Sequence, residues 1–444
     1  MNAGWVVRAG DVIAGRIDLA GLANMALRAG TLGARFALSI YLVRVLGFAA
    51  LGRFGLIAGL AGVLPSVLGF GMSYHVNRTL LHADRQEGYR LLRDRMAISV
   101  ALLMLLWGIG AFAVTMGLEL PPLALVAAAI ISLEVIAFDT HVGLLNLGRP
   151  LIANLLLFVR SASWIVPLIA VGLVWPAGRS FDAVLTFWLA ALVVNVALLP
   201  VLLMRDANLK RIMAQPIDWR TPWVQASRTP FIYLNDMAQA GQVYLDRFVV
   251  AHQLGIAAAG VYTLVFSVTH GVYLLSAAAT TQSAPRRLAA ALTARGASGF
   301  NSAMRIEAAR ALRTGGIVAA VVLVATLVIL PRFGFSGFVG SATLFAWMLA
   351  AALIRPLADL AQNGLYLARA DHALAGINLA GVALSIVGAL ALTAWLGLTG
   401  IGVAALGVTV AMLAARLAWL RARGQTLTGT PGPQSPDGSA SRGS

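Results

Sequence analysis

The amino-acid sequence predicts an all-α polytopic membrane protein with about twelve transmembrane helices in two pseudo-symmetric six-helix lobes. Hydrophobic residues make up 59% of the 444 residues and charged residues only 11%, whereas a soluble domain has about 25% charged residues. Long apolar runs recur along the chain, and one short sequence occurs twice. The first two observations predict membrane helices, and the third predicts the two lobes.

The apolar runs have the length of membrane spans. A helix that crosses a bilayer needs about 20 mostly apolar residues. Twelve runs meet this requirement, at 22–43, 53–77, 96–117, 122–147, 151–174, 182–204, 225–250, 257–283, 312–331, 340–367, 373–395 and 398–420. We therefore expect lobes at 22–204 and 225–420, joined by a cytoplasmic linker at 205–224.

Basic residues are concentrated in alternate connections, which predicts the orientation of the helices. The connections after the second, sixth and eighth runs carry Arg78, Arg85, Arg90, Arg93 and Arg95; Arg205, Lys210, Arg211 and Arg220; and Arg286, Arg287, Arg295, Arg305, Arg310 and Arg313. We therefore expect both termini to be cytoplasmic. Because this asymmetry accounts for most of the net charge of +16, we expect no nucleic-acid partner.

The two ends of the chain differ from the spans. Residues 1–21 mix charged and apolar residues and lack the apolar core of a signal peptide, so we expect a short interfacial helix. Residues 421–444 are rich in Gly, Pro and Ser and are expected to be disordered. Cysteine is absent, which excludes disulfides and Cys-ligated metals.

The doubled sequence is LGFAALGRFGL at 46–56 and LGIAAAGVYTL at 254–264, 208 positions apart. Seven of the eleven positions are identical or differ only as Phe and Tyr. Each copy lies at the junction of the first two helices of its half, and the same offset pairs Arg78 with Arg286. Two halves with the same orientation are parallel repeats, and the substrate path of such transporters lies at the repeat interface.

These residues resemble a known family. A helix containing Arg or Asp, the pattern LG-x-x-x-x-G-x-[FY] and a following helix that ends in a basic residue are similar to the polysaccharide-transporter branch of the multidrug/oligosaccharidyl-lipid/polysaccharide (MOP) flippase superfamily. The second copy, YLDRFVVAHQLGIAAAGVYTL with Asp246 and a later Pro285, matches best, and the resemblance covers about 80 residues. It implies two lobes around a central cavity lined by the first, second, seventh and eighth helices.

The resemblance also implies a function. Members of this branch, such as O-antigen flippases, move lipid-linked oligosaccharides across the bacterial cytoplasmic (inner) membrane for the synthesis of lipopolysaccharide and other surface polysaccharides. We therefore expect a flippase that contacts membrane lipids, is coupled to H⁺ or Na⁺ and works with other polysaccharide assembly proteins.

Polar side chains form one stripe on each of two predicted helices. The stripe of the first helix contains Asn24, Arg28, Thr31, Arg35 and Ser39, and that of the seventh contains Asn235 or Asp236, Gln239, Gln242 and Asp246. Steps of three and four residues place each set on one helix face. Because a charge in the bilayer centre costs about 2.5–3.5 kcal/mol or more, we expect both stripes to face a wet cavity. Asn24, Arg28, Thr31, Arg35, Asp236, Gln239 and Gln242 are therefore expected to bind the substrate.

Other charged residues lie inside predicted spans. Arg160 is expected to bind substrate or to pair with Glu134 or Asp139, and Arg355 to bind substrate or to pair with Asp359 one turn later. Residues Asp236, Asp246, Asp139 and Glu134 are candidates for ion coupling. We expect Arg44 and Arg247, near helix ends, to be interfacial anchors, and His270 to be a packing residue.

Arginine suits a diphosphate because its planar fork makes two parallel hydrogen bonds to phosphoryl oxygens. Arg28 and Arg35 are therefore expected to bind the diphosphate of the substrate. One alternative is a multidrug/cation antiporter of the same superfamily, which cavity arginines disfavour. Another is a membrane-embedded glycan polymerase or glycosyltransferase. Because no HExxH, Walker A or GxGxxG motif is present, we expect neither enzymatic activity nor a cofactor or metal.

Overall fold

The computed structural model describes residues 19–72, 84–203, 209–227, 230–280, 284–332, 341–368 and 370–423. Within these residues it contains helices and no strands, which confirms the all-α prediction. Residues 1–18 and 424–444 lie outside the described part, as does Arg78. The interfacial N-terminal helix and the disordered tail therefore stay predictions.

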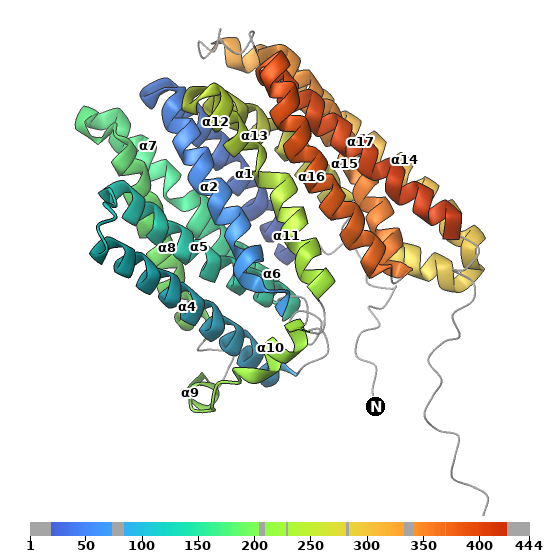
Figure 1. The fold of residues 1–444 in the computed structure, drawn as a ribbon, viewed down its shortest axis with the longest axis horizontal. Coiled ribbons are helices and arrows are strands. Elements are labelled where there is room, and N and C mark those ends of the chain that lie inside the picture. The colour runs from blue at the N-terminus through green and yellow to red at the C-terminus, as the bar shows by residue number, and fades with distance from the viewer. Residues whose placement is uncertain are drawn as a thin grey trace, which may run out of the picture. The chain divides into compact units, whose positions relative to one another are not determined.

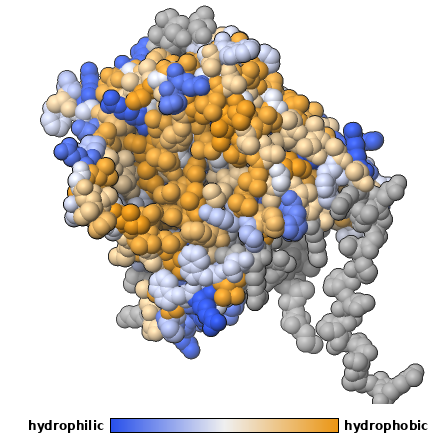
Figure 2. All heavy atoms as spheres, viewed as in Figure 1, coloured by the Kyte–Doolittle hydropathy of each residue, from blue (hydrophilic) through white to orange (hydrophobic). Residues whose placement is uncertain are grey.

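Eleven described helices are long and apolar enough to cross a membrane by length and composition. The expected crossing at 225–250 is not among them, because two shorter helices, α11 and α12, cover it. The structure is therefore consistent with about twelve spans. Figure 2 shows hydrophobic residues over much of the visible surface, and large apolar side chains such as Val174 and Trp395 are 85% and 88% exposed. This is the surface of a protein whose helices face lipid.

The chain forms two compact units, and the first comprises Met1–Leu46 and Met72–Ala226. Its helices are α1 (Leu19–Leu46), α4 (Arg85–Thr115), α5 (Pro122–Asn146), α6 (Pro150–Phe158), the π-helix η1 (Val159–Ser163), α7 (Ile165–Val174), the 3₁₀ turn η2 (Pro176–Gly178), α8 (Phe181–Leu203), α9 (Leu209–Met213) and most of α10 (Arg220–Ser227). Local sequence determines where several of these helices begin. Asp84 caps α4 by accepting a hydrogen bond from the backbone N–H of Glu87 at 2.9 Å, and proline occupies the first turn of α5 and of α6. Helix α1 packs on α6, and α5 packs on α8.

The second unit comprises Gly47–Gly71 and Ser227–Ser444. Its helices are α2 (Phe48–Gly69), α11 (Pro230–Tyr244), α12 (Asp246–Leu254), α13 (Ile256–Ala279), α14 (Ala284–Arg332), α15 (Ala342–Leu367), α16 (Asp371–Leu396) and α17 (Leu398–Arg423). Helices α15, α16 and α17 lie side by side, and α13 packs on α2 and α15 (Figure 1). Unit 2 thus groups α2 with the second half of the chain, whereas the sequence placed it in the first lobe; the lobe boundaries stay predictions.

Two helices differ from the continuous spans that the sequence predicted. The seventh span is broken at Leu245, between α11 and α12, so that Asp246 begins a new helix. The basic connection after the eighth span is itself helical, because α14 runs from Ala284 to Arg332 with a kink at Gly296, where φ is 59°. Glycine tolerates this positive φ without strain.

The doubled sequence forms two equivalent helix junctions. Gly47 separates α1 from α2 with φ 82° and ψ 172°, and Gly255 separates α12 from α13 with φ 88° and ψ 168°. These dihedral angles are available essentially to glycine alone. The same conformation at two positions 208 residues apart supports the equivalence of the two copies.

Within unit 2 the two copies also pack against each other. A Cβ added to Gly52 would overlap the carbonyl oxygen of Ile256, and one added to Gly260 would overlap that of Phe48. Each added Cβ would also lie 3.1 Å from the backbone nitrogen of the other glycine. Phe48 and Ile256 are equivalent under the repeat, so the contact is reciprocal. The two glycines are required because the backbones of α2 and α13 touch.

Candidate functional site

The arginines of the α1 stripe contact neutral groups on the neighbouring helix of unit 1. Arg28 donates from Nε to Oδ1 of Asn154 at 3.3 Å, and Arg35 donates from Nη2 to Oγ of Ser161 at 3.2 Å. Both pairs are separated by 126 residues, so α1 runs parallel to α6 and η1 in constant register. Arg28 is half-buried and Arg35 is exposed.

The hydroxyls of the same stripe are turned into their own helix. Thr31 donates to the carbonyl of Leu27 at 2.8 Å and Ser39 to that of Arg35 at 3.0 Å. Their residues are only 7% and 3% exposed. The side chain of Asn24 lies outside the described part of the chain. Among the members of this stripe whose side chains the structure describes, the two arginines are the accessible ones.

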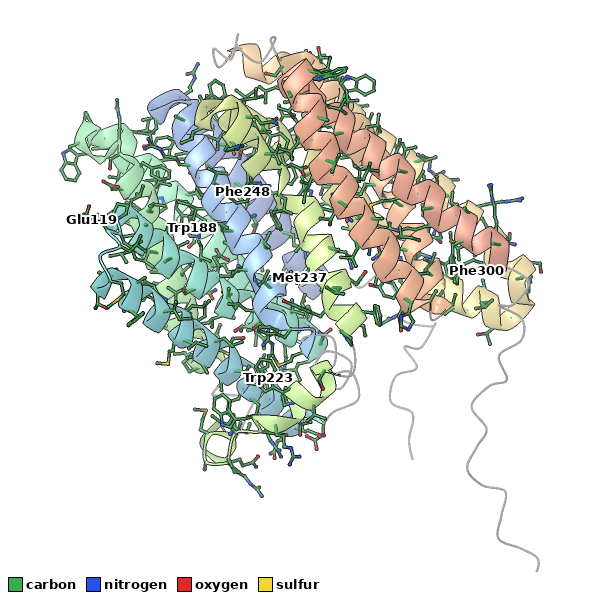
Figure 3. All side chains as sticks on the ribbon, in the orientation of Figure 1. Glu119, Trp188, Trp223, Met237, Phe248 and Phe300 are labelled. Carbon is green, nitrogen blue, oxygen red and sulfur yellow. The ribbon has the colours of Figure 1, made fainter. Side chains whose placement is uncertain are left out.

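Arg160 and Glu134 form a buried ion pair in unit 1, as one alternative of the sequence analysis expected. Arg160 lies in η1, where the chain widens into a π-helix. Glu134 also accepts a hydrogen bond from Nε1 of Trp188 at 3.0 Å, and the indole of Trp188 is stacked on that of Trp164 (Trp188 is labelled in Figure 3). The charge of Arg160 is thus matched within the unit.

A second buried ion pair joins α4 and α5. Arg95 lies 3.2 Å from Oδ2 of Asp139, and Ser99 donates to the same oxygen at 2.6 Å. The described carboxylates buried in the middle of unit 1, Glu134 and Asp139, are therefore each paired with an arginine. Their availability for ion coupling stays a prediction.

The stripe of α11 joins a polar network in unit 2. Asn235 accepts a 2.5 Å hydrogen bond from Nδ2 of Asn378, whose carbonyl accepts from Gln242 at 2.9 Å. Arg416 donates to Oδ1 of Asn378 at 2.6 Å and to the carbonyl of Ala358 at 2.8 Å. Asn235 is buried, whereas Asp236 beside it is half-buried.

A cavity of about 260 Å³ lies next to this network, inside unit 2. Its charged wall residues are Asp246, Arg355, Asp359 and Arg416, and the wall also contains Gln239, Gln242, Gln362, Ser385, Thr409 and the α13 residues Tyr262, Phe266, Thr269, His270 and Tyr273. The sequence analysis named four residues of this wall as candidates: Gln239, Gln242, Asp246 and Arg355. The structure brings these four together around one volume.

Tyrosines hold the two cavity carboxylates. Tyr262 donates to Oδ2 of Asp246 at 3.0 Å, and Tyr273 donates to Oδ2 of Asp359 at 2.8 Å. Ser385 lies 3.4 Å from Oδ1 of Asp246. Neither carboxylate belongs to an ion pair among the described residues.

The expected pairing of Arg355 and the expected role of Arg247 are wrong, whereas substrate binding by Arg355 stays a prediction. Arg355 does not pair with Asp359 but lies over the ring of Tyr273, 5.0 Å from its centroid. Arg247 is not an interfacial anchor, because it is 4% exposed and donates to the carbonyl of Gly55 at 3.1 Å. In both cases the guanidinium contacts an aromatic ring of α13. Arg355 lies over Tyr273 where the sequence predicted an acid, and Arg247 lies 4.8 Å from the centroid of Phe266 where the sequence predicted water.

Sequence reasoning missed Tyr262, Tyr273, Asn378 and Arg416. Arg416 carried a detectable signal, since it is an arginine within the last predicted span. Tyr262 carried a signal too, since it is the last position of the pattern LG-x-x-x-x-G-x-[FY] in the second copy. Tyr273 and Asn378 carried none, because one polar side chain in an apolar run is common. Among the described residues, no group of three or more His, Cys, Asp or Glu could hold a metal ion.

Solved structures with the same architecture are transporters. The chain superposes on the inward-facing conformation of a multidrug resistance MATE family transporter of the MOP superfamily with a TM-score of 0.62 and 16% identity, covering 93% of this chain and 99% of the other. It superposes on MATE in complex with MaL6 with a TM-score of 0.60 and 18% identity, covering 93% of this chain and 97% of the other. A third match is a MOP superfamily transporter from Pyrococcus furiosus, with a TM-score of 0.54 and 15% identity, covering 93% of this chain and 95% of the other. Its binding pocket is described as having reverse polarity that suggests a different function.

No protein-family profile and no curated protein matches the chain. The structural likeness shows a fold that these transporters of the MOP superfamily also have, and this is the fold that the sequence resemblance predicted. The polysaccharide-transporter branch stays a prediction.

Proposed function

We propose that this protein is a flippase that moves a lipid-linked, diphosphate-anchored oligosaccharide across the bacterial inner membrane for cell-surface polysaccharide synthesis. The observation that carries the proposal is the arginine pair of α1. Arg28 and Arg35 are seven residues apart on one helix face, which is about 10 Å along the axis. Each arginine fork can make two parallel hydrogen bonds to phosphoryl oxygens, and two long side chains on one helix face can converge on one diphosphate headgroup.

The charge balance of unit 1 supports an anionic ligand. The buried carboxylates of the described part of unit 1, Asp94, Glu134 and Asp139, are each engaged by an arginine, namely Arg93, Arg160 and Arg95. Arg28 meets the neutral amide of Asn154, and no ion pair among the described residues includes it. A charge within a membrane span is costly. The presence of Arg28 there without a described acidic partner therefore favours a role in binding an anion.

The same charges oppose the alternative substrate class. A cationic drug near Arg28 and Arg35 would meet like charge in a medium of low dielectric constant, where repulsion is strong. The fold alone is compatible with either class, since MATE multidrug transporters share it. The Pyrococcus furiosus transporter, whose pocket of reverse polarity is described as suggesting a different function, supports the view that this fold serves more than one function.

For ion coupling we favour Asp236 over Asp246. Asp236 is half-buried on α11 and is not part of the cavity wall, whereas the wall that contains Asp246 also contains Arg355 and Arg416. Two arginines weaken the binding of a cation by repulsion. Asp236→Asn should therefore abolish the dependence of transport on a proton or sodium gradient, and Asp246→Asn should leave that dependence in place.

The test is complementation of glycan export in a strain that lacks its own flippase, at matched membrane expression. Arg35→Ala should nearly abolish export, because each charge-assisted contact contributes about 1.5–3 kcal/mol. Arg35→Lys should restore export in part, since it keeps the charge and loses the fork. The matched control is Arg44→Ala, in the last turn of the same helix, which should export normally. Near-normal export by Arg35→Ala would overturn the proposal, as would a wild-type protein that confers resistance to cationic dyes and exports no glycan.

A further inference from the structure

The cavity of unit 2 is not used by the proposed diphosphate contacts, and its wall carries both signs of charge, unlike the arginine pair of α1. We infer that it is a binding site for a neutral, hydroxyl-rich ligand of the size of one sugar ring. The inference deepens the proposed function, on which it rests, by assigning a place for one sugar of the glycan.

The charges of the wall balance. Asp246 and Asp359 contribute two negative charges, and Arg355 and Arg416 contribute two positive charges. A cation would be opposed by the arginines and an anion by the aspartates. A ligand without net charge avoids both penalties, and it can use both kinds of group if it carries donors and acceptors together. Sugar hydroxyls do so, because each is one donor and an acceptor.

The oppositely charged groups of the wall form no ion pair with one another, and neighbouring side chains orient them. Tyr262 fixes Asp246 and Tyr273 fixes Asp359, each through one carboxylate oxygen at 3.0 and 2.8 Å. Arg355 lies over the Tyr273 ring instead of meeting Asp359. Buried opposite charges that do not collapse into an ion pair present their hydrogen-bonding capacity to the enclosed space. A ligand that bonds to both signs is then bound by a preformed site.

Arg416 supplies a specific unmet donor. The residue is 3% exposed and lines the cavity, and two of its nitrogens donate to Ala358 and Asn378. Its third nitrogen, Nε, is buried without a hydrogen-bond partner. An unsatisfied buried donor of a charged group costs about 1–3 kcal/mol or more. The guanidinium that lines the cavity therefore keeps a hydrogen-bonding capacity that the described side chains do not use.

Aromatic rings of α13 supply the apolar part of the wall. Phe266 and His270 are stacked with ring centroids 4.8 Å apart, and His270 and Tyr273 follow at 5.4 Å. Rings of this kind offer large apolar faces with polar edges, which suit the C–H face of a sugar. The volume of 260 Å³ lies below the range of about 300–1,000 Å³ typical for drug-sized ligands, so one sugar ring is the size that fits.

The test measures sugar binding by saturation-transfer difference NMR on the full chain in lipid nanodiscs. The probes are the methyl glycosides of glucose, galactose and N-acetylglucosamine. We expect transfer from the protein to the ring protons of at least one probe, with millimolar affinity. Asp359→Asn, which keeps the shape and removes the charge, should weaken binding at least tenfold, and Ala405→Leu, which fills the cavity, should abolish it. Asp218→Asn, at a half-buried position in unit 1 that is not part of the cavity, should bind like the wild type.

The outcomes separate this inference from the proposed function. Absence of transfer with all three probes, or equal binding by Asp359→Asn and the wild type, overturns the inference. Competitive displacement of the sugar by sodium, with potassium as control, also overturns it, because the site would then be a cation site. If Arg35→Ala abolishes export while no probe binds, only the inference fails; if a probe binds and Arg35→Ala exports normally, only the proposed function fails. A variant counts only if its thermal transition in detergent matches that of the wild type.

Discussion

The interiors of the two units use the same charged residue types in opposite ways. In unit 1, Glu134 and Asp139 are in direct contact with Arg160 and Arg95, and tryptophan or serine completes each pair. In unit 2, the carboxylates of the cavity bond to tyrosines, and the arginines bond to carbonyls or lie on a ring. In unit 1 each of these buried charges is neutralised by direct contact with its partner. In unit 2 the charges of the wall sum to zero but are not paired, and they border a cavity.

This difference separates structural charges from ligand-binding charges. A buried ion pair satisfies itself, and breaking it leaves one uncompensated charge. Charges held apart around a cavity gain from a third component that contacts both. We therefore expect ligands to bind most favourably at two places. These are the accessible guanidinium groups of α1 in unit 1 and the cavity of unit 2.

The largest effect is expected at the closed pair of unit 1. Glu134→Gln leaves the charge of Arg160 buried without its partner and should lower the free energy of unfolding by about 3–5 kcal/mol. The measurement is the thermal transition of the purified protein in detergent. Replacing both residues, as Glu134→Leu with Arg160→Met, should recover much of the loss, because an apolar pair of similar volume replaces the ion pair. If the single variant were as stable as the wild type, the pair would not be a structural element.

A second effect is expected where backbones touch inside unit 2. Gly52→Ala would force a Cβ into the carbonyl of Ile256, and overpacking of this kind costs about 1–3 kcal/mol. Gly407→Ala is the matched control, since nothing lies within 4 Å of its added Cβ in α17; it should be neutral or stabilising by up to about 1 kcal/mol. Both are read from thermal transitions. Equal transitions for the two variants would show that the α2–α13 contact is looser than described.

A smaller effect is expected at the open cavity. Tyr273→Phe removes the hydroxyl that donates to Asp359 at 2.8 Å, and the net cost should be about 1 kcal/mol. The cost is lower than that of breaking the Glu134 pair because water in the cavity can solvate the freed carboxylate. Thermal transitions of the two variants measured side by side test the comparison. A loss for Tyr273→Phe as large as that for Glu134→Gln would mean that the cavity is a closed structural network.

The smallest effect is expected outside both interiors, at Asp218. The backbone N–H groups of Thr221 and Arg220 donate to its Oδ1 at 3.0 and 3.1 Å, and the bond from Thr221 holds the pKa of Asp218 below its ordinary value. A lowered pKa means that the cap stabilises α10 above the unfolded-state pKa and is lost as pH falls through the folded-state pKa. Hydrogen exchange in α10, corrected for intrinsic rates, should therefore speed up at low pH in the wild type. Asp218→Asn, which keeps the acceptor and does not titrate, should show no such change.

Composition and periodicity were enough to predict the helices and the repeat, whereas contacts decided by a distant side chain were not predictable from the sequence. The apolar runs predicted the helices, and the 208-residue offset led to Gly47 and Gly255, which share one backbone conformation. The pairing of Arg160 with Glu134 could be proposed because a buried arginine needs an acid. The pairing of Arg355 with Asp359 was wrong because Tyr273, from α13, bonds to the acid and lies beneath the arginine. Neither helical spacing nor composition predicts which aromatic ring of another helix lies between Arg355 and Asp359.

The reciprocal contact of Gly52 with Ile256 and of Gly260 with Phe48 has an evolutionary consequence. In a two-fold homodimer, residue i of one subunit meets residue j of the other while j meets i, so a single surface serves as both partners. Here two stretches of one chain, related by the repeat, meet in that manner. Such a contact is the one expected if a gene for a dimer-forming half was duplicated and fused. Each glycine is then the descendant of one ancestral residue, and neither copy could gain a side chain without disturbing the other.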